Sequence, residues 1–573
     1  MSDPINHRTP DIELNASASG DVVGIVQALV ENMLRSDGRV YISVLLMLTY
    51  IGAVLTGPIM NGHDTYISFS HVEIWASALR AGDLFSVWTP VDANGFGSPV
   101  PFFYHKLFNL VAAFLTLSTG DIVTGVRAGI LLFSFVMFAG MDRCAAYLGA
   151  DRRSRLVIGT ICTLSPYTLV CIFERGALAE YSAMALVPFG IAQVIALFTA
   201  RNRPRPVLML SIVLMLLALA HVTIFVAAVG LLALFGLFAI KRAPVAGIVL
   251  LGLSGVATSL FVGLVYMPFA FWSSYFSPSQ ARLHGLPADN TVALIRIFSP
   301  NPGSWFGWPV LALTIALAWQ FRRRTGRLAS MVWIPGSIAV ILLLCMTRLA
   351  APLWRTSDLL DFVQFPWRFL SLTTPLIFIV LAASIEQLAP TQRRYVQLGL
   401  LVMTLLNTGG MLASWHRVFS MIPVAELRHQ VSSTGPGPDA GGEYFPARYS
   451  AQLAATPDLL ARGAASILPS RRPLIEAGGG CTSADILQMA YIASLHFEAH
   501  CASVGSIRVN QFDTPFLDVT AKRNDGLTIH PFADGVFFDL PLSTGNWTIH
   551  VRQRTYLELV RMVWGARFSH FRP

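Results

Sequence analysis

The chain has 573 residues, of which 54% are hydrophobic and 13% are charged, and its mean hydropathy is +0.58. Soluble domains carry about 25% charged residues, so this composition excludes a lone soluble enzyme, a disordered chain and a secreted disulfide scaffold. The apolar residues form long continuous runs rather than an alternating pattern, which excludes a transmembrane β-barrel. The sequence therefore predicts an α-helical polytopic membrane protein.

The formal net charge of +9 is concentrated in short Arg-rich loops. Such loops are the usual orientation signal of membrane proteins, so we assign them to the cytoplasmic side and expect no nucleic-acid partner. Residues 1–38 are expected to form a cytoplasmic N-terminal segment. Its first twenty residues are polar, no cleaved signal peptide is evident, and 21–36 have the spacing of an amphipathic helix on the membrane surface.

The apolar runs predict about eleven spans in a transmembrane domain at 39–414. They are 39–59, 122–141, 154–173, 183–200, 207–220, 222–240, 245–269, 305–320, 329–347, 369–387 and 395–414. With the N-terminus inside, the inner loops hold 15 Lys and Arg in 39 residues. Alternatively, 102–119 is a further span, or 207–240 is one long span. The positive-inside rule favours a half-buried or surface helix at 102–119 and a hairpin near His221.

This topology puts the long first loop 60–121, the loops 174–182, 270–304 and 348–368, and everything after 415 on the extracytoplasmic side. Residues 415–554 predict a β-rich domain, with Gly/Pro-rich connectors at 435–442 and 478–480. Alternating runs at 490–499, 505–511, 515–520, 525–531, 535–541 and 547–553, with a turn at Asn524-Asp-Gly526, predict a small antiparallel sandwich. Residues 555–573 are too short and charged to span and predict an interfacial amphipathic tail.

The six cysteines fall into two groups. Cys144, Cys162, Cys171 and Cys345 lie in or beside predicted spans and are interpreted as packing residues. Cys481 and Cys501 lie in the external domain, where a disulfide forms only if the compartment is oxidising, so both states stay open. No Cys/His spacing indicates a metal site. We expect no cofactor, and a divalent metal is left open without support.

The first outer loop holds the clearest candidate for catalysis. Asp64 follows the first span at the water–membrane boundary, with His63 beside it and His71 two helical turns further on. A carboxylate near two histidines could act as the general base for an acceptor hydroxyl. The alternative is that Asp64 only caps the helix that starts there. His105 and the other polar residues of this loop are interpreted as surface groups.

An ordered set of motifs resembles a known family. The motifs are His63-Asp64, His71, Gly82, Trp88-Thr-Pro90, Gly95-Phe-Gly97-Ser-Pro99, Phe103-Tyr104, Glu174-Arg-Gly176 with Glu180, Gln364-Phe-Pro-Trp-Arg-Phe-Leu370, and Glu443-Tyr444 with Pro446. On these motifs the chain resembles bacterial membrane proteins catalogued as 6-pyruvoyl-tetrahydropterin-synthase-related. It lacks the His-rich zinc site of a soluble pterin synthase, so we do not expect that activity.

The architecture in turn resembles the GT-C superfamily, integral-membrane glycosyltransferases that use polyprenyl-phosphate sugars. The resemblance implies that Asp64 is the catalytic base. It also implies a bacterial inner-membrane location, a polyprenyl-phosphate-linked sugar as donor and a glycan or lipid acceptor. Members that bind a metal usually carry an Asp-x-Asp pair, which is absent beside Asp64.

Two arginines at the outer boundary are candidates to bind the donor phosphate. Arg175 could hold it in a bidentate fork while Glu180 orients the sugar, or the two could form a structural ion pair. Arg368, with Gln364 four residues before it, could bind phosphate or merely anchor lipid headgroups.

His221 and Tyr104 complete the candidate substrate contacts, although a lone histidine between apolar runs is more often a turn residue. The sequence thus favours a glycosyltransferase that also contacts membrane lipids. The alternatives are a non-enzymatic transporter, or an export or assembly component for lipid-linked glycans.

Overall fold

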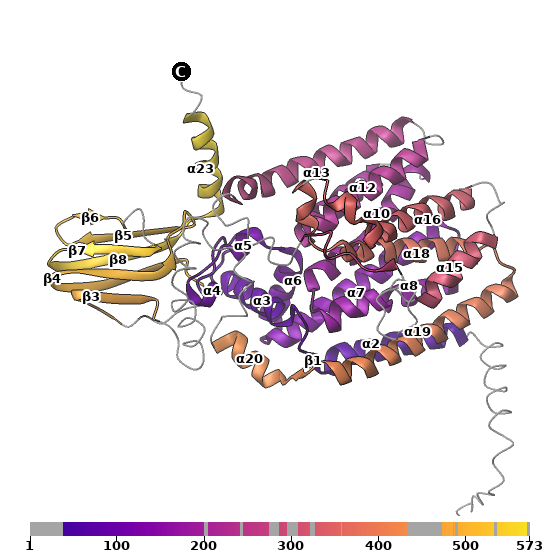
Figure 1. Cartoon of the computed structure of the whole chain (residues 1–573), viewed down its shortest axis with the longest axis horizontal. Helices are drawn as coiled ribbons and strands as arrows, with labels where there is room; N and C mark the ends of the chain where they lie inside the picture. Colours follow the sequence, from indigo (N-terminus) through magenta and orange to yellow (C-terminus); the bar gives the residue numbers. More distant parts are fainter. Residues whose placement is uncertain are drawn as a thin grey trace, which may run out of the picture.

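A computed structural model describes residues 38–199, 204–240, 245–273, 286–294, 308–320, 327–356, 358–433, 473–484, 486, 491–531 and 536–569. The predicted amphipathic helix at 21–36, the connector at 435–442 and the motif Glu443-Tyr444 with Pro446 lie outside these residues. A helical bundle forms one end of the molecule and a β-sheet the other, with short helices of the first loop between them (Figure 1).

Each predicted span coincides with helix, because long apolar runs satisfy their backbone hydrogen bonds internally. Asp121 and Asp151 cap two of these helices by accepting hydrogen bonds from the backbone N–H of Thr124 and Ser154. The bundle helices are α2 (Gly38–Thr56), α7 (Ile122–Tyr147), α8 (Arg152–Thr163), α9 (Pro166–Leu169), η1 (Val170–Glu174), α10 (Leu178–Thr199), α11 (Pro204–Ala220), α12 (Val222–Ile240), α13 (Val245–Trp272), α15 (Trp308–Gln320), α16 (Arg327–Cys345), α18 (Leu370–Ile385) and α19 (Pro390–Val418).

The count of eleven spans is not confirmed. Within the described part of the chain, six helices are long and apolar enough to cross a membrane, or seven if the pair 152–163 and 166–174, bent by 45°, is one span. The other predicted spans correspond to shorter apolar helices. The chain is therefore a multi-pass membrane protein, and the number of its crossings stays a prediction.

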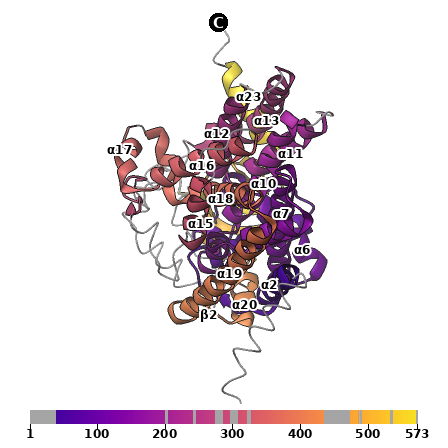
Figure 2. The same ribbon diagram turned by 90° about the vertical axis from the view of Figure 1, so that its right-hand side faces the viewer.

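The helices differ in how much of their surface the protein itself covers. The most apolar window of α10 is 89% buried and that of α18 is 83% buried, whereas the window of α13 is only 11% buried. Figures 1 and 2 both place α10 and α18 in the middle of the bundle and α2, α13 and α19 outside. The exposed leucines of α13, such as Leu260 and Leu264, suit contact with lipid.

The segment 102–119 and the hairpin near His221 have the expected form. Two short helices, α5 (Val100–Phe103) and α6 (Leu107–Thr119), occupy the first segment. The 13 residues of α6 extend about 20 Å at 1.5 Å per residue, short of the roughly 30 Å of a bilayer core. His221 separates α11 from α12, so 207–240 is two helices.

Six antiparallel strands form the β-domain: β3 (Ile475–Ser483), β4 (Ser494–Phe512), β5 (Leu517–Arg523), β6 (Thr528–Ile529), β7 (Phe537–Leu542) and β8 (Gly545–Gln553). The predicted sandwich is wrong, because all six belong to one hydrogen-bonded sheet. The two runs predicted at 490–499 and 505–511 are the single long strand β4, which pairs with β8 along its first half and with β7 along its second.

Several local predictions for this domain can be compared with the structure. The turn at Asp525-Gly526 joins β5 and β6, with Gly526 at φ +95°. Cys481 and Cys501 face each other on β3 and β4 and form a disulfide. The glycines 478–480 belong to β3 rather than to a connector. The tail forms the helix α23 (Tyr556–Ser569), whose Tyr556 donates hydrogen bonds to carbonyls of α13.

The first loop packs into the β-domain. Trp88 and Phe96 belong to the same buried cluster as Phe512 and the other apolar side chains of the sheet. The Trp88 indole N–H donates to Gln511 Oε1 at 2.9 Å, and the Phe512 N–H donates to the Phe96 carbonyl at 2.8 Å. The family-like motif from Trp88 to Gly97 is therefore an interface between the loop and the sheet, and it lies apart from the catalytic candidates.

Gly97 allows this interface to close. Its φ is +84°, and a Cβ there would lie 2.3 Å from Gln511 Oε1 and 2.5 Å from the Trp88 ring. Gly97→Ala is therefore expected to lower the free energy of unfolding by about 1–3 kcal/mol more than a glycine with the same backbone but open surroundings. Gly82, at φ +79° with no atom within 4 Å, supplies that control as Gly82→Ala. Thermal unfolding of both variants in detergent checks this, and equal stabilities would contradict it.

Candidate functional site

Asp64 is held at the junction of two outer loops. It lies between β1 (Ile59–Met60), which pairs with β2 (Met421–Ile422), and α3 (Thr65–Arg80). Its backbone N–H donates to the Arg175 carbonyl at 2.7 Å, and the Ser68 hydroxyl donates to the Gly176 carbonyl at 2.7 Å. Gly176 has φ +66°, and a Cβ there would lie 2.7 Å from the Thr65 hydroxyl oxygen. The glycine thus lets the two loops meet closely.

The Asp64 side chain does not act as the helix cap. It occupies the capping position of α3 but makes no capping hydrogen bond, and it is half-buried. Burial raises the pKa of Asp64, against the opposing electrostatic effects of Arg175 and then Arg368. A half-buried carboxylate with a raised pKa and no capping role fits a general base better than a structural cap.

Arg175 and Glu180 form the ion pair that was the structural alternative. Arg175 Nη1 lies 2.9 Å from Glu180 Oε2 and donates to the Tyr167 hydroxyl at 3.1 Å. Tyr167 and Ser371 both donate to Glu180 Oε1. The side chains of Arg175 and Glu180 are only 10% and 2% exposed. This burial leaves Arg175 poorly placed to bind phosphate directly, and its evident role is to hold Glu180 and the loop.

Arg368 is the more available arginine. It lies in η6 (Pro366–Phe369), with its guanidinium over the Phe365 ring and Nη1 3.5 Å from Gln364 Oε1. Its Nε is 3.7 Å from Glu180 Oε2, so both arginines share one carboxylate. The Arg368 side chain is 17% exposed. Gln364 adopts φ +53°, a conformation that turns the chain just before η6.

Three histidines and a tyrosine form a row of contacting rings, and the last of them, His221, is close enough to Arg368 to interact with it electrostatically. His71 packs against Tyr104 with centroids 4.4 Å apart, Tyr104 lies 4.9 Å from His105, and His105 stacks on His221 at 4.0 Å. His221 also accepts a long 3.5 Å hydrogen bond from the Ile224 N–H through Nδ1, as a turn residue would. This contact agrees with the interpretation of His221 as a turn residue, and the stacked ring of His105 adds a polar neighbour.

The described contact of His71 is with Tyr104 rather than with Asp64. His71 is buried against Tyr104, whereas the groups that act electrostatically on Asp64 are Arg175, Arg368, Glu180 and His63. Burial lowers the pKa of His71 to about 4. His63 is exposed beside Asp64.

Sequence reasoning missed three members of the site. Tyr167 and Ser371 each carry a hydroxyl within an apolar run, and both bind Glu180. The signal that could have identified them is a polar group within a predicted span, because burying such a group in the membrane costs free energy unless it has a hydrogen-bond partner. His105 was assigned to the surface, yet it stacks on His221. Within the described residues, no group of three or more His, Cys, Asp or Glu side chains is arranged to hold a metal ion.

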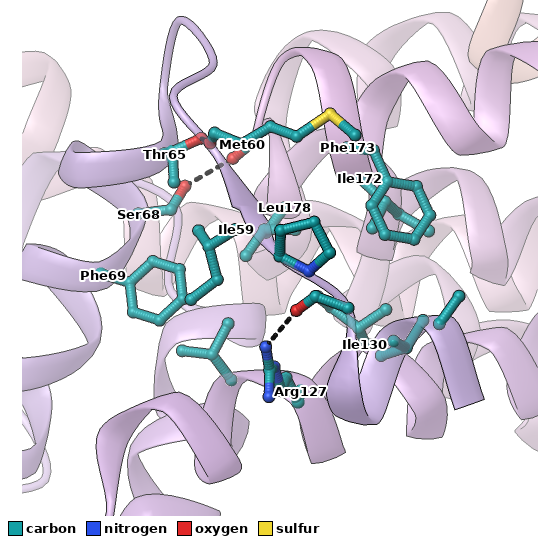
Figure 3. Close-up of a pocket in the computed structure, with 16 residues that line it drawn as sticks. Ile59, Met60, Thr65, Ser68, Phe69, Arg127, Ile130, Ile172, Phe173 and Leu178 are labelled. Atoms are coloured by element: carbon teal, nitrogen blue, oxygen red, sulfur yellow. Dashed lines mark hydrogen bonds between the residues drawn. The ribbon is translucent and has the colours of Figure 1, made fainter. Parts of the chain in front are cut away.

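A separate apolar pocket lies behind the Asp64 loop, between α2, α3, α7 and η1 (Figure 3). Thr65 donates to the Met60 carbonyl at one end, and Arg127 donates to the Gly57 carbonyl at the other. None of the predicted site residues lines this pocket. The arginine is occupied by backbone carbonyls, so the pocket adds no charged group to the site.

Comparison with known proteins gives weak likenesses only. No family model and no curated protein matches the chain, so the resemblance to the 6-pyruvoyl-tetrahydropterin-synthase-related family is not supported. Among solved structures, arabinofuranosyltransferase AftD from Mycobacteria is 17% identical, over 65% of this chain and 27% of its own, with a TM-score of 0.42. The chain thus spans about a quarter of AftD.

Two further structures have the same degree of similarity. ArnT from Cupriavidus metallidurans bound to undecaprenyl phosphate is 14% identical over 75% of this chain and 74% of its own, with a TM-score of 0.44. The oligosaccharyltransferase from Archaeoglobus fulgidus is 10% identical over 71% and 57%, with a TM-score of 0.41. These neighbours are GT-C glycosyltransferases. At TM-scores below 0.5 the likeness assigns neither fold nor activity, so the function has to be argued from the site.

Proposed function

We propose that the protein is an integral-membrane glycosyltransferase. It transfers a sugar from a polyprenyl-phosphate donor to an envelope glycan, lipid or protein acceptor on the extracytoplasmic side of the bacterial inner membrane, with its N-terminus in the cytoplasm. The observation that carries the proposal is the grouping of Asp64, a half-buried carboxylate that makes no capping hydrogen bond, with Arg368, a partly accessible guanidinium that acts on it electrostatically.

The proposed reaction is a single displacement. Asp64 takes the proton from an acceptor hydroxyl, and the resulting oxygen attacks the anomeric carbon of the donor sugar. The bond from that carbon to the phosphate oxygen breaks, and polyprenyl phosphate leaves with the bonding electrons. Arg368 stabilises the charge that develops on the leaving phosphate. One displacement inverts the anomeric centre.

Arg175 and Glu180 have a positioning role in this proposal. Because the Arg175 carbonyl binds the Asp64 N–H, the buried ion pair fixes the loop on which the base sits. The shared carboxylate of Glu180 likewise orients Arg368. A transporter for lipid-linked glycans is the second candidate, favoured by one observation: Glu180, the other carboxylate that acts electrostatically on Asp64, is fully paired.

Arg368→Ala separates these two functions. We expect it to lower the rate of sugar transfer about 10²–10³-fold, the usual cost of removing one donor that stabilises developing charge, with Arg368→Lys intermediate. Membranes are supplied with a panel of radiolabelled polyprenyl-phosphate sugars, and release of polyprenyl phosphate is followed by thin-layer chromatography. Arg355→Ala is the control, because Arg355 is 65% exposed and contacts only Asp289, at 3.7 Å, among its described ion-pair partners.

Two results would contradict the proposal. The first is no release of polyprenyl phosphate from any donor by the wild-type protein in membranes that contain acceptor. The second is full transfer by Arg368→Ala at normal expression. Sugar movement across vesicles without release of polyprenyl phosphate would support the transporter.

A further inference from the structure

The fixed charges around Asp64 balance one another. Two carboxylates, Asp64 and Glu180, stand against two guanidiniums, Arg175 and Arg368, and the four interact electrostatically. The donor is a phosphodiester with one negative charge. The product polyprenyl phosphate is a phosphomonoester, whose second ionisation has a pKa near 6, so it carries close to two charges at neutral pH. The additional charge needs donors beyond the two arginines.

His105 and His221 lie where such donors would be required. η6, which carries Arg368, packs against α12, and His221 immediately precedes the first residue of α12. The His105 ring stacks on His221 with centroids 4.0 Å apart and planes 24° apart, so the two imidazoles lie side by side. Arg368 acts electrostatically on both rings.

The tautomer of His221 follows from its contact with the backbone. Nδ1 accepts the Ile224 N–H, so in the neutral ring the proton resides on Nε2, which is then a donor. His221 is 4% exposed, whereas His105 as a whole residue is half-buried. The first turn of α12 adds the positive end of a 19-residue helix.

We propose, resting on the function proposed above, that His105 and His221 join Arg368 in a subsite that prefers a phosphomonoester dianion to a phosphodiester. Both imidazoles bind the phosphate released from the donor, and His105 takes up a proton as its second charge develops, because Nδ1 of His221 already accepts the Ile224 N–H. The protons balance: the acceptor hydroxyl gives its proton to Asp64, the phosphate gains one negative charge, and the proton that enters His105 comes from solvent.

The charged surroundings explain why the pair is neutral before the phosphate arrives. Burial lowers the pKa of both rings. Arg368 lowers both further, as do Lys106 and His71 for His105 and Arg175 for His221. A bound dianion opposes every one of these positive charges and raises both pKa values, so binding couples to proton uptake.

The test compares two lipids on the full-length protein in detergent. Undecaprenyl phosphate is the monoester, and its methyl ester is the diester. Isothermal titration calorimetry at pH 7, in buffers of different ionisation enthalpy, gives both affinity and protons taken up. We expect the wild type to bind the monoester at least tenfold more tightly, with uptake of up to about one proton per lipid.

His105→Phe keeps the stacked ring and removes the donors. It is expected to lose about tenfold in affinity for the monoester, the scale of one hydrogen bond to a charged group, and to lose most of the proton uptake, with little change for the diester. His105→Gln restores part of the affinity without the uptake. The control is His496→Phe, from the stacked pair of His496 and His550 on the exposed face of the sheet.

Inorganic phosphate as a competitor distinguishes recognition of phosphate from that of the prenyl tail. It should weaken lipid binding to the wild type more than lipid binding to His105→Phe, which keeps only Arg368 and His221. The proposal is overturned if His105→Phe keeps the preference for monoester and the proton uptake, or if phosphate competes equally in both proteins. If the wild type transfers sugar normally while this occurs, the glycosyltransferase proposal stands and only the histidine subsite falls. If the wild type binds neither lipid and transfers no sugar, both fall.

Discussion

Asp64→Asn is expected to lower the rate of sugar transfer about 10²–10⁴-fold, the contribution typical of a positioned general base. Asparagine keeps the size of the side chain but accepts no proton. The backbone contact of residue 64 with Arg175 does not depend on the side chain, so the loop should stay in place. The measurement is single-turnover transfer in membranes, with saturating polyprenyl-phosphate sugar, so that weaker binding is not mistaken for slower chemistry.

The pH dependence gives the same residue a second signature. Burial raises the pKa of the Asp64 carboxyl. The base works only when ionised, so the rate should fall as the pH drops through this raised pKa, at a higher pH than for an ordinary aspartate. Asp64→Asn should remove that limb of the profile from its residual activity.

Glu73→Gln is a matched control for Asp64→Asn. Glu73 also lies on α3, but its partner is Arg80 at 2.8 Å, and it has no place in the mechanism. Normal transfer by Asp64→Asn, or an equal loss in Glu73→Gln, would show that Asp64 is not the base. A loss of protein from the membrane in either variant would be seen by immunoblot and corrected for.

Arg175→Met is expected to destabilise the protein by about 3 kcal/mol, the lower end of the 3–5 kcal/mol cost of breaking a buried ion pair. It leaves Glu180, which is 2% exposed, without its closest cation. Arg368 at 3.7 Å remains as a weaker partner, together with the hydroxyls of Tyr167 and Ser371, which is why the cost stays near the lower end. Thermal unfolding in detergent measures it.

The double variant Arg175→Met/Glu180→Leu distinguishes stability from function. Replacing both charges by apolar groups removes the unpaired carboxylate, so most of the stability should return. Transfer should stay low, because Glu180 no longer orients Arg368. Arg368→Ala, in contrast, should cost little stability and much activity. A double variant as unstable as Arg175→Met, or one with full transfer, would contradict the positioning role.

The helices and the polar residues at their ends could be predicted from the sequence more accurately than the residues that those polar groups contact. Apolar runs predicted every bundle helix, because satisfying the backbone in lipid requires little else. Asp64, Arg175, Glu180 and Arg368 could be predicted as one site, since all follow or precede apolar runs at the same boundary, and the structure brings them together.

The rest depended on contacts between distant segments. Nothing local indicates that Trp88 packs against a sheet residue 423 positions later, or that His105 stacks on His221. The number of spans is not confirmed for a related reason. An apolar run gives the same local signal whether or not its helix is long enough to cross a bilayer, and six or seven helices of the described residues are that long. The sandwich prediction was wrong because the alternation of polar and apolar residues is interrupted in the middle of β4. That interruption predicts two strands joined by a turn, whereas the structure has one continuous strand.

The docking of the first loop on the β-domain has a consequence for biogenesis. The contact between Trp88 and Gln511 cannot form until the ribosome has added Gln511, which is 423 residues later in the chain. At about 5–20 residues per second, this is a delay of roughly 20–85 seconds. During that time the helices already emerging can enter the bilayer, while the segment after α3 lacks its packing partner. The first loop therefore reaches its final packing only after β4 has been made, however early the helices of the bundle enter the membrane.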